Sequence, residues 1–335
     1  MMNFPVVDLH CDLLSYLAQY PDGSPNDTDE IGCAIPFLQK GNVCVQIMAV
    51  YTPTGPESTK LYDLQMTAYH KLLKHYHKYF YQPEPHTLDD VAARGDRTAT
   101  FLAIENGSGL CLEDEPLDKG LQRLDQLIRD YRHILYISLT HHDENRFGGG
   151  NKATAGLKPD GKHLLEFLSG KKIAVDLSHT SDALAYDIVN YIHHKGLDIP
   201  FIASHSNFRS VCAHNRNLPD DLVSAIAAQN GLIGMNLLRP YIHPDDPAVL
   251  KTHIRYGFEQ GAGHCMAMGA DFFATREYGN THGVPFFYEE HQDASCYPGI
   301  LNSVSDTLGV AELKALAYEN AVRFMQQLWS VEEKA

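Results

Sequence analysis

Two hydrophobic patterns alternate along the whole chain. Apolar runs of four to nine residues are typical of strands buried in a parallel sheet. Between them lie stretches in which apolar residues recur at helical spacing. The short runs predict eight strands, at 4–9, 43–51, 98–104, 134–139, 172–177, 200–203, 231–235 and 265–269. The other stretches predict helices at 59–81, 118–131, 161–169, 181–193, 220–229, 248–261, 299–308, 311–318 and 321–328.

The order of these elements predicts the fold. Alternating strands and helices imply a parallel sheet with crossover helices. Eight such units in 335 residues fit an α/β protein with a (β/α)8 TIM barrel, followed here by C-terminal helices. No linker or change of composition divides the chain, so we expect residues 1–335 to form a single domain. A long loop at 20–35 and an insertion around 278–297 are the expected irregularities.

Single residues refine the predicted helices. In the longest helix, 59–81, the apolar face is expected to include Leu64 and Leu72. Ser181 is a suitable N-cap for the helix that follows it. Trp329, the one tryptophan, is expected to pack the last helix against the rest of the protein.

Composition narrows the class of function. There are 42 acidic against 27 basic residues, a net charge of −15, which argues against binding to nucleic acid or to anionic membranes. No stretch approaches 18 consecutive apolar residues and no signal-peptide pattern is visible, so we expect a cytoplasmic protein without a membrane anchor. The seven cysteines are scattered without a CxxC pair, and we expect reduced, mostly buried thiols.

Candidate chemistry gathers where the predicted strands end. In a barrel, the carboxyl ends of the strands carry the active site. The chain has 19 histidines, about twice the number of an average composition. Histidine, aspartate and glutamate follow the predicted strands at His10, Asp12, Glu105, His141, His179, His205 and Asp271.

The residue types at these ends indicate a metal site. His10 and Asp12 are two residues apart, so in an extended strand their side chains share one face. Such a pair alone more often caps a strand, but three further strand ends add Glu105, His179 and His205. Nitrogen and oxygen ligands suit Zn²⁺ or another first-row divalent ion. The set exceeds one tetrahedral centre, so two ions bridged by a carboxylate are predicted, with Glu105 central in chain order.

Seven stretches of the chain resemble the membrane (renal) dipeptidase family of zinc peptidases, peptidase family M19, within the amidohydrolase-like barrels. They occur in the family's order and span roughly residues 6–275. They read DLHCDLL at 8–14, VYTPT at 50–54, AIENG at 103–107, ISLTHHDENRF at 137–147, AVDLSHTS at 174–181, IASHSNFRSVCAHNRNLPDDL at 202–222 and MGADF at 268–272.

The resemblance implies a role for each candidate residue. One zinc would be bound by His10, Asp12 and Glu105, and the second by Glu105, His179 and His205. Mn²⁺ or Co²⁺ are possible substitutes. The catalytic residues would be Asp271 as acid and base, Glu105 as bridging ligand, and His141 beside the scissile carbonyl. The substrate would be bound by His141, by Arg216 at its carboxylate, and by Tyr241 in the pocket wall.

The implied function is that of a binuclear zinc dipeptidase. A metal-activated bridging water would hydrolyse the peptide bond of dipeptides, including those that end in a D-residue, and the family suggests a homodimer. The alternative is another metal-dependent amidohydrolase on the same barrel, such as an amidase or a β-lactam hydrolase. A non-hydrolytic binding protein on a degenerate barrel is a third hypothesis, which the complete ligand set disfavours.

The sequence departs from the family pattern in three places. Asn106 follows Glu105 where a second glycine is usual, and Phe273 stands where the common form has aspartate. Residues 276–297 are unlike a typical member. We expect these changes to affect substrate preference more than the metal site.

The remaining polar residues are expected to have ordinary structural roles, or the sequence allows two roles for them. His70, His75 and His77 are expected at the surface, and His193 with His194 at a helix end, where a cation suits the helix dipole. Arg209 is expected either near the pocket or paired with an acid, and His142 either behind the ligands or on a loop surface. His282 and His291 lie in the divergent stretch. Gly148–Gly150 lacks the context of a phosphate loop, which argues against nucleotide binding.

Overall fold

Eight parallel strands form a ring in the computed structural model, which describes residues 4–93, 95, 97–131, 133–276 and 285–330. Neighbouring strands pair in the order β7-β6-β5-β4-β2-β1-β9-β8, and a parallel bridge between Ala203 and Ile233 joins the two ends. The predicted (β/α)8 barrel is therefore confirmed. The strands are β1 Val6–Cys11, β2 Val43–Tyr51, β4 Thr98–Glu105, β5 Ile134–Ser138, β6 Ala174–Asp176, β7 Phe201–Ile202, β8 Ile233–Met235 and β9 Met266–Met268.

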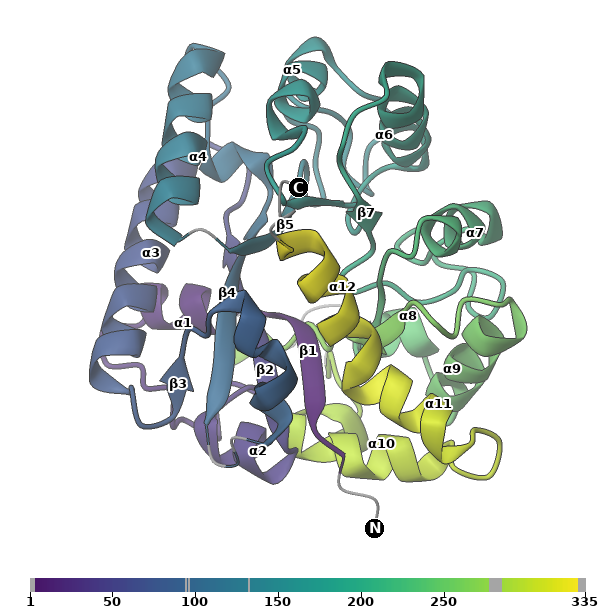
Figure 1. Ribbon diagram of the computed structural model, residues 1–335. Helices are drawn as coiled ribbons and strands as arrows, with labels where there is room; N and C mark the ends of the chain where they lie inside the picture. Colours follow the sequence, from purple (N-terminus) through teal and green to yellow (C-terminus); the bar gives the residue numbers. More distant parts are fainter. Residues whose placement is uncertain (1–3, 94, 96, 132, 277–284, 331–335) are drawn as a thin grey trace, which may run out of the picture.

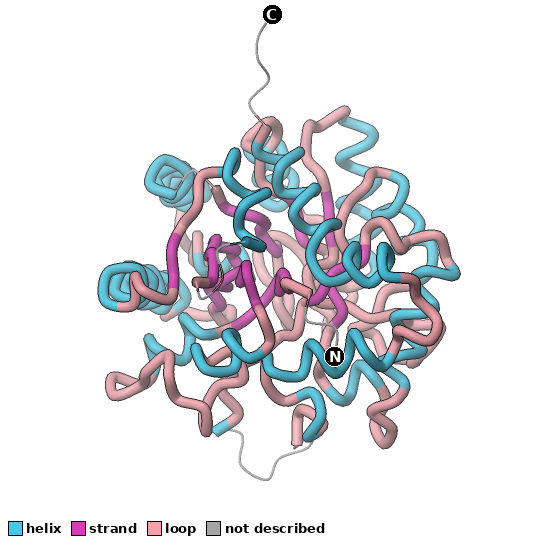
Figure 2. The backbone as a smooth tube through the Cα atoms, turned by 60° about the horizontal axis from the view of Figure 1, so that its bottom comes forward, coloured by secondary structure: helices cyan, strands magenta, loops and turns pink. Residues whose placement is uncertain are grey.

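Helices surround this ring on the outside (Figures 1 and 2). They are α1 Leu13–Gln19, α2 Ile35–Lys40, α3 Ser58–His75, α4 Leu117–Tyr131, α5 Pro159–Leu168, α6 Asp182–Lys195, α7 Asp220–Ala228, α8 Arg239–Ile242, α9 Val249–Glu259, α10 Tyr297–Ser303, α11 Val310–Lys314 and α12 Asn320–Trp329. A π-helical segment, Ala315–Glu319, joins α11 to α12, so the two last predicted helices form one continuous helical stretch. Short 3-10 turns lie at Pro85–Ala93, Gly107–Gly109, Glu289–His291 and Ala294–Cys296.

The predicted helix over 59–81 was wrong at its end and on part of its face. Helix α3 ends at His75, and Phe80–Tyr81 form the short strand β3, which pairs with β4 beside the ring. The buried face of α3 includes Tyr62, Tyr69 and Leu72. Leu64 is turned by about 200° from Tyr62 at helical spacing, and it is 43 % exposed. Tyr62 and Tyr69 share the buried face with Leu72, whereas Leu64 does not lie on it.

The barrel interior shows why Glu105 reaches the site. Along β4, the alternate residues Ala99, Phe101 and Ala103 are buried in one apolar cluster. Glu105 continues this alternation at the strand's end, so its carboxylate emerges above the apolar interior. At the other end of the barrel, α12 covers the starts of the strands, and the ring of Trp329 lies 4.6 Å from that of Phe101.

The predictions for the two ends of α6 and for the cysteines are confirmed. The Ser181 hydroxyl accepts a hydrogen bond from the Leu184 N–H at 3.0 Å, which caps α6. His193 and His194 lie in the last turn of that helix. The seven cysteines are all unpaired, and five of them are buried. Among the described residues, no helix is both long and apolar enough to cross a membrane.

Candidate metal centre and substrate pocket

The candidate ligands and acids meet at the carboxyl ends of the strands. His10 lies in β1, and Asp12 follows that strand directly. Glu105 is the last residue of β4. The other four candidates each lie three residues beyond a strand end, and they are His141 after β5, His179 after β6, His205 after β7 and Asp271 after β9. All seven side chains therefore come from the same end of the barrel.

Three residues in this region have a strained backbone conformation. His179 and Asp271 have φ values of 65° and 67°, in the region that non-glycine residues seldom adopt. Asn106 has a φ of 77°. Its side chain donates to the Thr52 carbonyl at 2.9 Å and accepts from the Asn145 amide at 2.9 Å. These bonds explain how asparagine takes the place of a glycine here without losing the turn.

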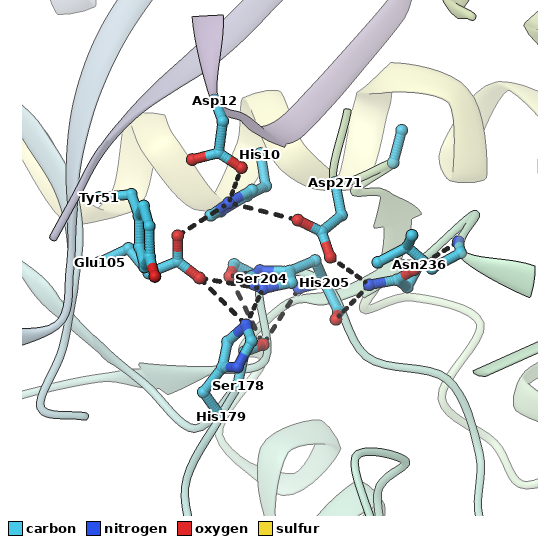
Figure 3. Close-up of polar contacts among 12 residues, drawn as sticks. His10, Asp12, Tyr51, Glu105, Ser178, His179, Ser204, His205, Asn236 and Asp271 are labelled. Carbon is cyan, nitrogen blue, oxygen red and sulfur yellow. Dashed lines mark hydrogen bonds and ion pairs between the residues drawn. The ribbon is translucent and has the colours of Figure 1, made fainter. Parts of the chain in front are cut away.

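Two groups of ligand atoms share the Glu105 carboxylate (Figure 3). On one side, Glu105 Oε2 lies 3.4 Å from His10 Nε2, which lies 3.7 Å from Asp12 Oδ2. On the other side, Glu105 Oε1 lies 3.0 Å from His179 Nε2 and 3.6 Å from His205 Nε2. The five predicted ligands thus form two half-sites, with one oxygen of Glu105 facing each.

The donor atoms fit divalent cations. His10 Nε2 is buried without a hydrogen-bond partner among the described residues. The Nε2 atoms of His179 and His205 face each other at 3.0 Å. Burial lowers the pKa of these two imidazoles, which favours the neutral form that binds metal. Burial also raises the pKa of Glu105 and that of Asp271, the latter to about 7, and the neighbouring carboxylates add to the rise. A bound cation would offset the free-energy cost of burying these negative charges close together.

A hydrogen-bond network lies behind the ligands. His10 Nδ1 is 2.6 Å from the hydroxyl of Tyr136, and this hydroxyl donates to the Leu9 carbonyl at 3.1 Å. The imidazole therefore donates its Nδ1–H to Tyr136, which leaves Nε2 free to face the half-site. His205 Nδ1 lies 2.7 Å from the Ser204 hydroxyl, which donates to Asp176 at 2.8 Å. These contacts set which nitrogen of each ligand carries the proton.

Two further residues position Asp271, and sequence reasoning missed both. Asn236 donates to Asp271 Oδ2 at 3.0 Å. Asp8 accepts from the backbone N–H groups of Ala270 at 3.0 Å and His10 at 3.2 Å, and from the Tyr297 hydroxyl at 2.7 Å. A polar residue inside an apolar strand, such as Asp8, is a signal that could have identified this role. Asn236 carries no comparable signal.

A cavity of about 480 Å³ opens above the ligands. Of the predicted substrate residues, His141 and Tyr241 line it, as does Asp271. His141 Nε2 lies 3.9 Å from Glu105 Oε1. Arg216 is 4 % exposed and does not line the cavity: it donates to Ser206 Oγ at 2.8 Å and lies 5.6 Å from the centre of the Tyr241 ring. The arginine therefore sits behind the pocket wall.

Comparison with known proteins decides the family. A family model described as membrane dipeptidase (peptidase family M19) matches residues 1–335. The chain belongs to the membrane dipeptidase family. It is accordingly a dipeptidase of the metallopeptidase class, a hydrolase.

Relatives and solved structures agree with this assignment. The dipeptidase is 24 % identical to an uncharacterised dipeptidase of Schizosaccharomyces pombe, across 96 % of this chain and 80 % of the relative. A dipeptidase of Aspergillus oryzae is 25 % identical, across 89 % and 71 %. A metallopeptidase from Rhodobacter sphaeroides shares the fold with a TM-score of 0.81 at 17 % identity, across 98 % of this chain and all of the other (100 %).

The remaining histidines and Arg209, whose roles the sequence left open or assigned to the surface, differ in whether they line the cavity of this dipeptidase. His142 lines it and contacts Asn151 at 2.9 Å. Arg209 pairs with Asp182 at 2.7 Å, so it serves the structure rather than the pocket. His291 is buried outside the cavity, and His282 lies outside the described residues. As predicted, the surface histidines are exposed, and they are His70, His75 and His77.

Proposed function

We propose that this dipeptidase hydrolyses dipeptides with two divalent metal ions that share the Glu105 carboxylate. The observation that supports this proposal is the division of Glu105, with Oε2 beside His10 and Oε1 beside His179. His10, Asp12 and Glu105 would hold one ion, and Glu105, His179 and His205 the other. Zn²⁺ suits these nitrogen and oxygen donors, and Mn²⁺ or Co²⁺ are alternatives.

The bound ions would supply Lewis acidity and lower the pKa of water. The proposed proton carrier is Asp271, which would accept a proton from the attacking water and return it to the leaving amine. Burial raises the pKa of Asp271 to about 7, and bound cations would lower it again, so the carboxylate form is available near neutral pH. Asn236 holds Oδ2 of this carboxylate, which leaves Oδ1 toward the ligands.

The substrate would be held by residues around the cavity. His141 is proposed to donate to the oxygen of the scissile carbonyl as negative charge develops on it. Tyr241 lines the cavity, and the buried Arg216 behind it adds positive charge that favours the substrate carboxylate. The Rhodobacter structure holds a phosphinate mimic of L-Ala-D-Ala, so dipeptides that end in a D-residue belong in the test panel.

The test is hydrolysis of dipeptides by zinc-loaded protein, with metal content measured on the same samples. We expect two ions per chain, release of amino acids from L-L and L-D dipeptides, and no action on tripeptides or N-acetylated dipeptides. Glu105→Gln should abolish activity and lower the metal content, whereas Glu259→Gln, an exposed glutamate on α9, should change neither. Inactivity on every dipeptide with both ions bound would instead favour an amidase or β-lactam hydrolase.

A further inference from the structure

The substrate cavity has two chemically different walls. The first, here called the aromatic wall, consists of Phe273, Phe286 and Leu238, from the chain segments after β9 and β8. The second, the polar wall, consists of His142, Lys152 and Asn215 with their neighbours, from the segments after β5 and β7. An apolar surface on only one side of a cavity orients a ligand that has polar and apolar ends.

The aromatic wall is fixed by backbone pairing as well as by ring contacts. The centre of the Phe273 ring lies 5.3 Å from the centre of the Phe286 ring and 5.8 Å from that of the Phe287 ring. Leu238 and Phe287 form an antiparallel bridge, and the Arg239 N–H donates to the Phe286 carbonyl at 2.8 Å. The wall is therefore held in place before a substrate arrives, which lowers the entropy cost of binding.

Charge fixes which end of a dipeptide meets this wall. Asp12 lines the cavity and carries a negative charge, so its carboxylate suits the α-ammonium group. The Asp12 N–H donates to the Phe272 carbonyl at 2.9 Å, so Asp12 lies beside Phe273. Lys152 is exposed in the polar wall and favours the α-carboxylate. The first residue of the dipeptide then lies next to Phe273.

We propose that Phe273 determines substrate specificity, and that the aromatic wall binds an apolar side chain on the first residue of the dipeptide. This inference rests on the proposed function. Phe273 is one of the positions at which the sequence departs from the family pattern, so the preference does not follow from the family assignment. An aspartate at this position would disfavour an apolar side chain, because its carboxylate would lose contact with water.

The experiment compares kcat/KM for Leu-Gly and Gly-Leu, with Gly-Gly as the reference, on zinc-loaded full-length protein. We expect Leu-Gly to exceed Gly-Leu by roughly tenfold or more, the usual range for an apolar side chain in a pocket. Phe273→Ala should reduce that ratio by roughly tenfold, mainly through the KM for Leu-Gly. The ratio is measured within each preparation, so it does not depend on the folded fraction.

Phe258→Ala is the matched control, because Phe258 is also half-buried but lies on α9 outside the cavity. If Phe273→Ala does not fold, Phe286→Ala provides the same test at the partly exposed side of the wall. A wild-type ratio near one, or a ratio that neither variant changes, overturns the inference alone. Failure of the metal-loaded wild type to hydrolyse any of the dipeptides overturns the proposed function as well.

Discussion

The substitution Tyr136→Phe tests how the Tyr136 hydroxyl affects metal binding by the proposed ligand His10. Tyr136 is fully buried (0 % exposed), and the substitution removes only its hydroxyl, 2.6 Å from His10 Nδ1 and 3.1 Å from the Leu9 carbonyl. The ring stays, so packing changes little. The His10 Nδ1–H then loses its acceptor inside the barrel, and the other tautomer, which puts the proton on the ligand nitrogen, becomes more favourable.

The expected effect on metal binding follows from the lost contact to His10 Nδ1. A buried donor without an acceptor costs about 1–3 kcal/mol, which corresponds to about 5- to 150-fold in a dissociation constant. Removing such outer contacts from metal sites typically lowers metal affinity by about 10- to 100-fold. Because His10 belongs to one half-site, we expect weaker binding of one ion and nearly unchanged binding of the other.

The assay is a zinc titration of metal-free protein in competition with a chromophoric chelator, which resolves two affinities. Tyr69→Phe is the matched control: Tyr69 is equally buried, and its hydroxyl contacts Thr100 at 3.1 Å away from the ligands. Two unchanged affinities in Tyr136→Phe would refute the reasoning. So would an equal loss in Tyr69→Phe, because the effect would then reflect general destabilisation.

Two further predictions concern stability and assembly. Burial lowers the pKa of His253 to about 4, and its ring accepts from the Phe208 N–H and donates to the Ile242 carbonyl. The unfolded chain, with an ordinary histidine pKa near 6.5, takes up the proton first. The contribution of His253 to stability is therefore complete above pH 6.5 and falls by about 3 kcal/mol toward pH 4. Urea unfolding should show a smaller loss over this range in His253→Gln. The homodimer implied by the family resemblance predicts twice the 37.4 kDa chain mass in light scattering, and a monomer mass would contradict it.

The sequence predicted the barrel and the meeting of the ligands because both depend on local patterns. Apolar runs mark strands whichever strands become neighbours, and parallel strands bring their carboxyl ends to one side. The end of α3 was missed because Phe80 extends the helical pattern, whereas its burial as a strand depends on pairing with Thr98. The position of Arg216 behind the pocket wall depends on the fold of the loop that carries it, which no spacing rule predicts.

The contact between Tyr136 and His10 is another feature that local sequence patterns could not predict. It lies within the apolar run of β5, where an aromatic residue ordinarily means core packing, and β1 is not a neighbour of β5 in the sheet. The hydroxyl reaches His10 only because the closed barrel places the two strands across a shared interior. A pattern along the chain indicates the face on which a side chain lies, but not what stands opposite that face after closure. Candidate ligands at strand ends can therefore be identified from sequence, whereas the groups that orient them emerge only from the closed barrel.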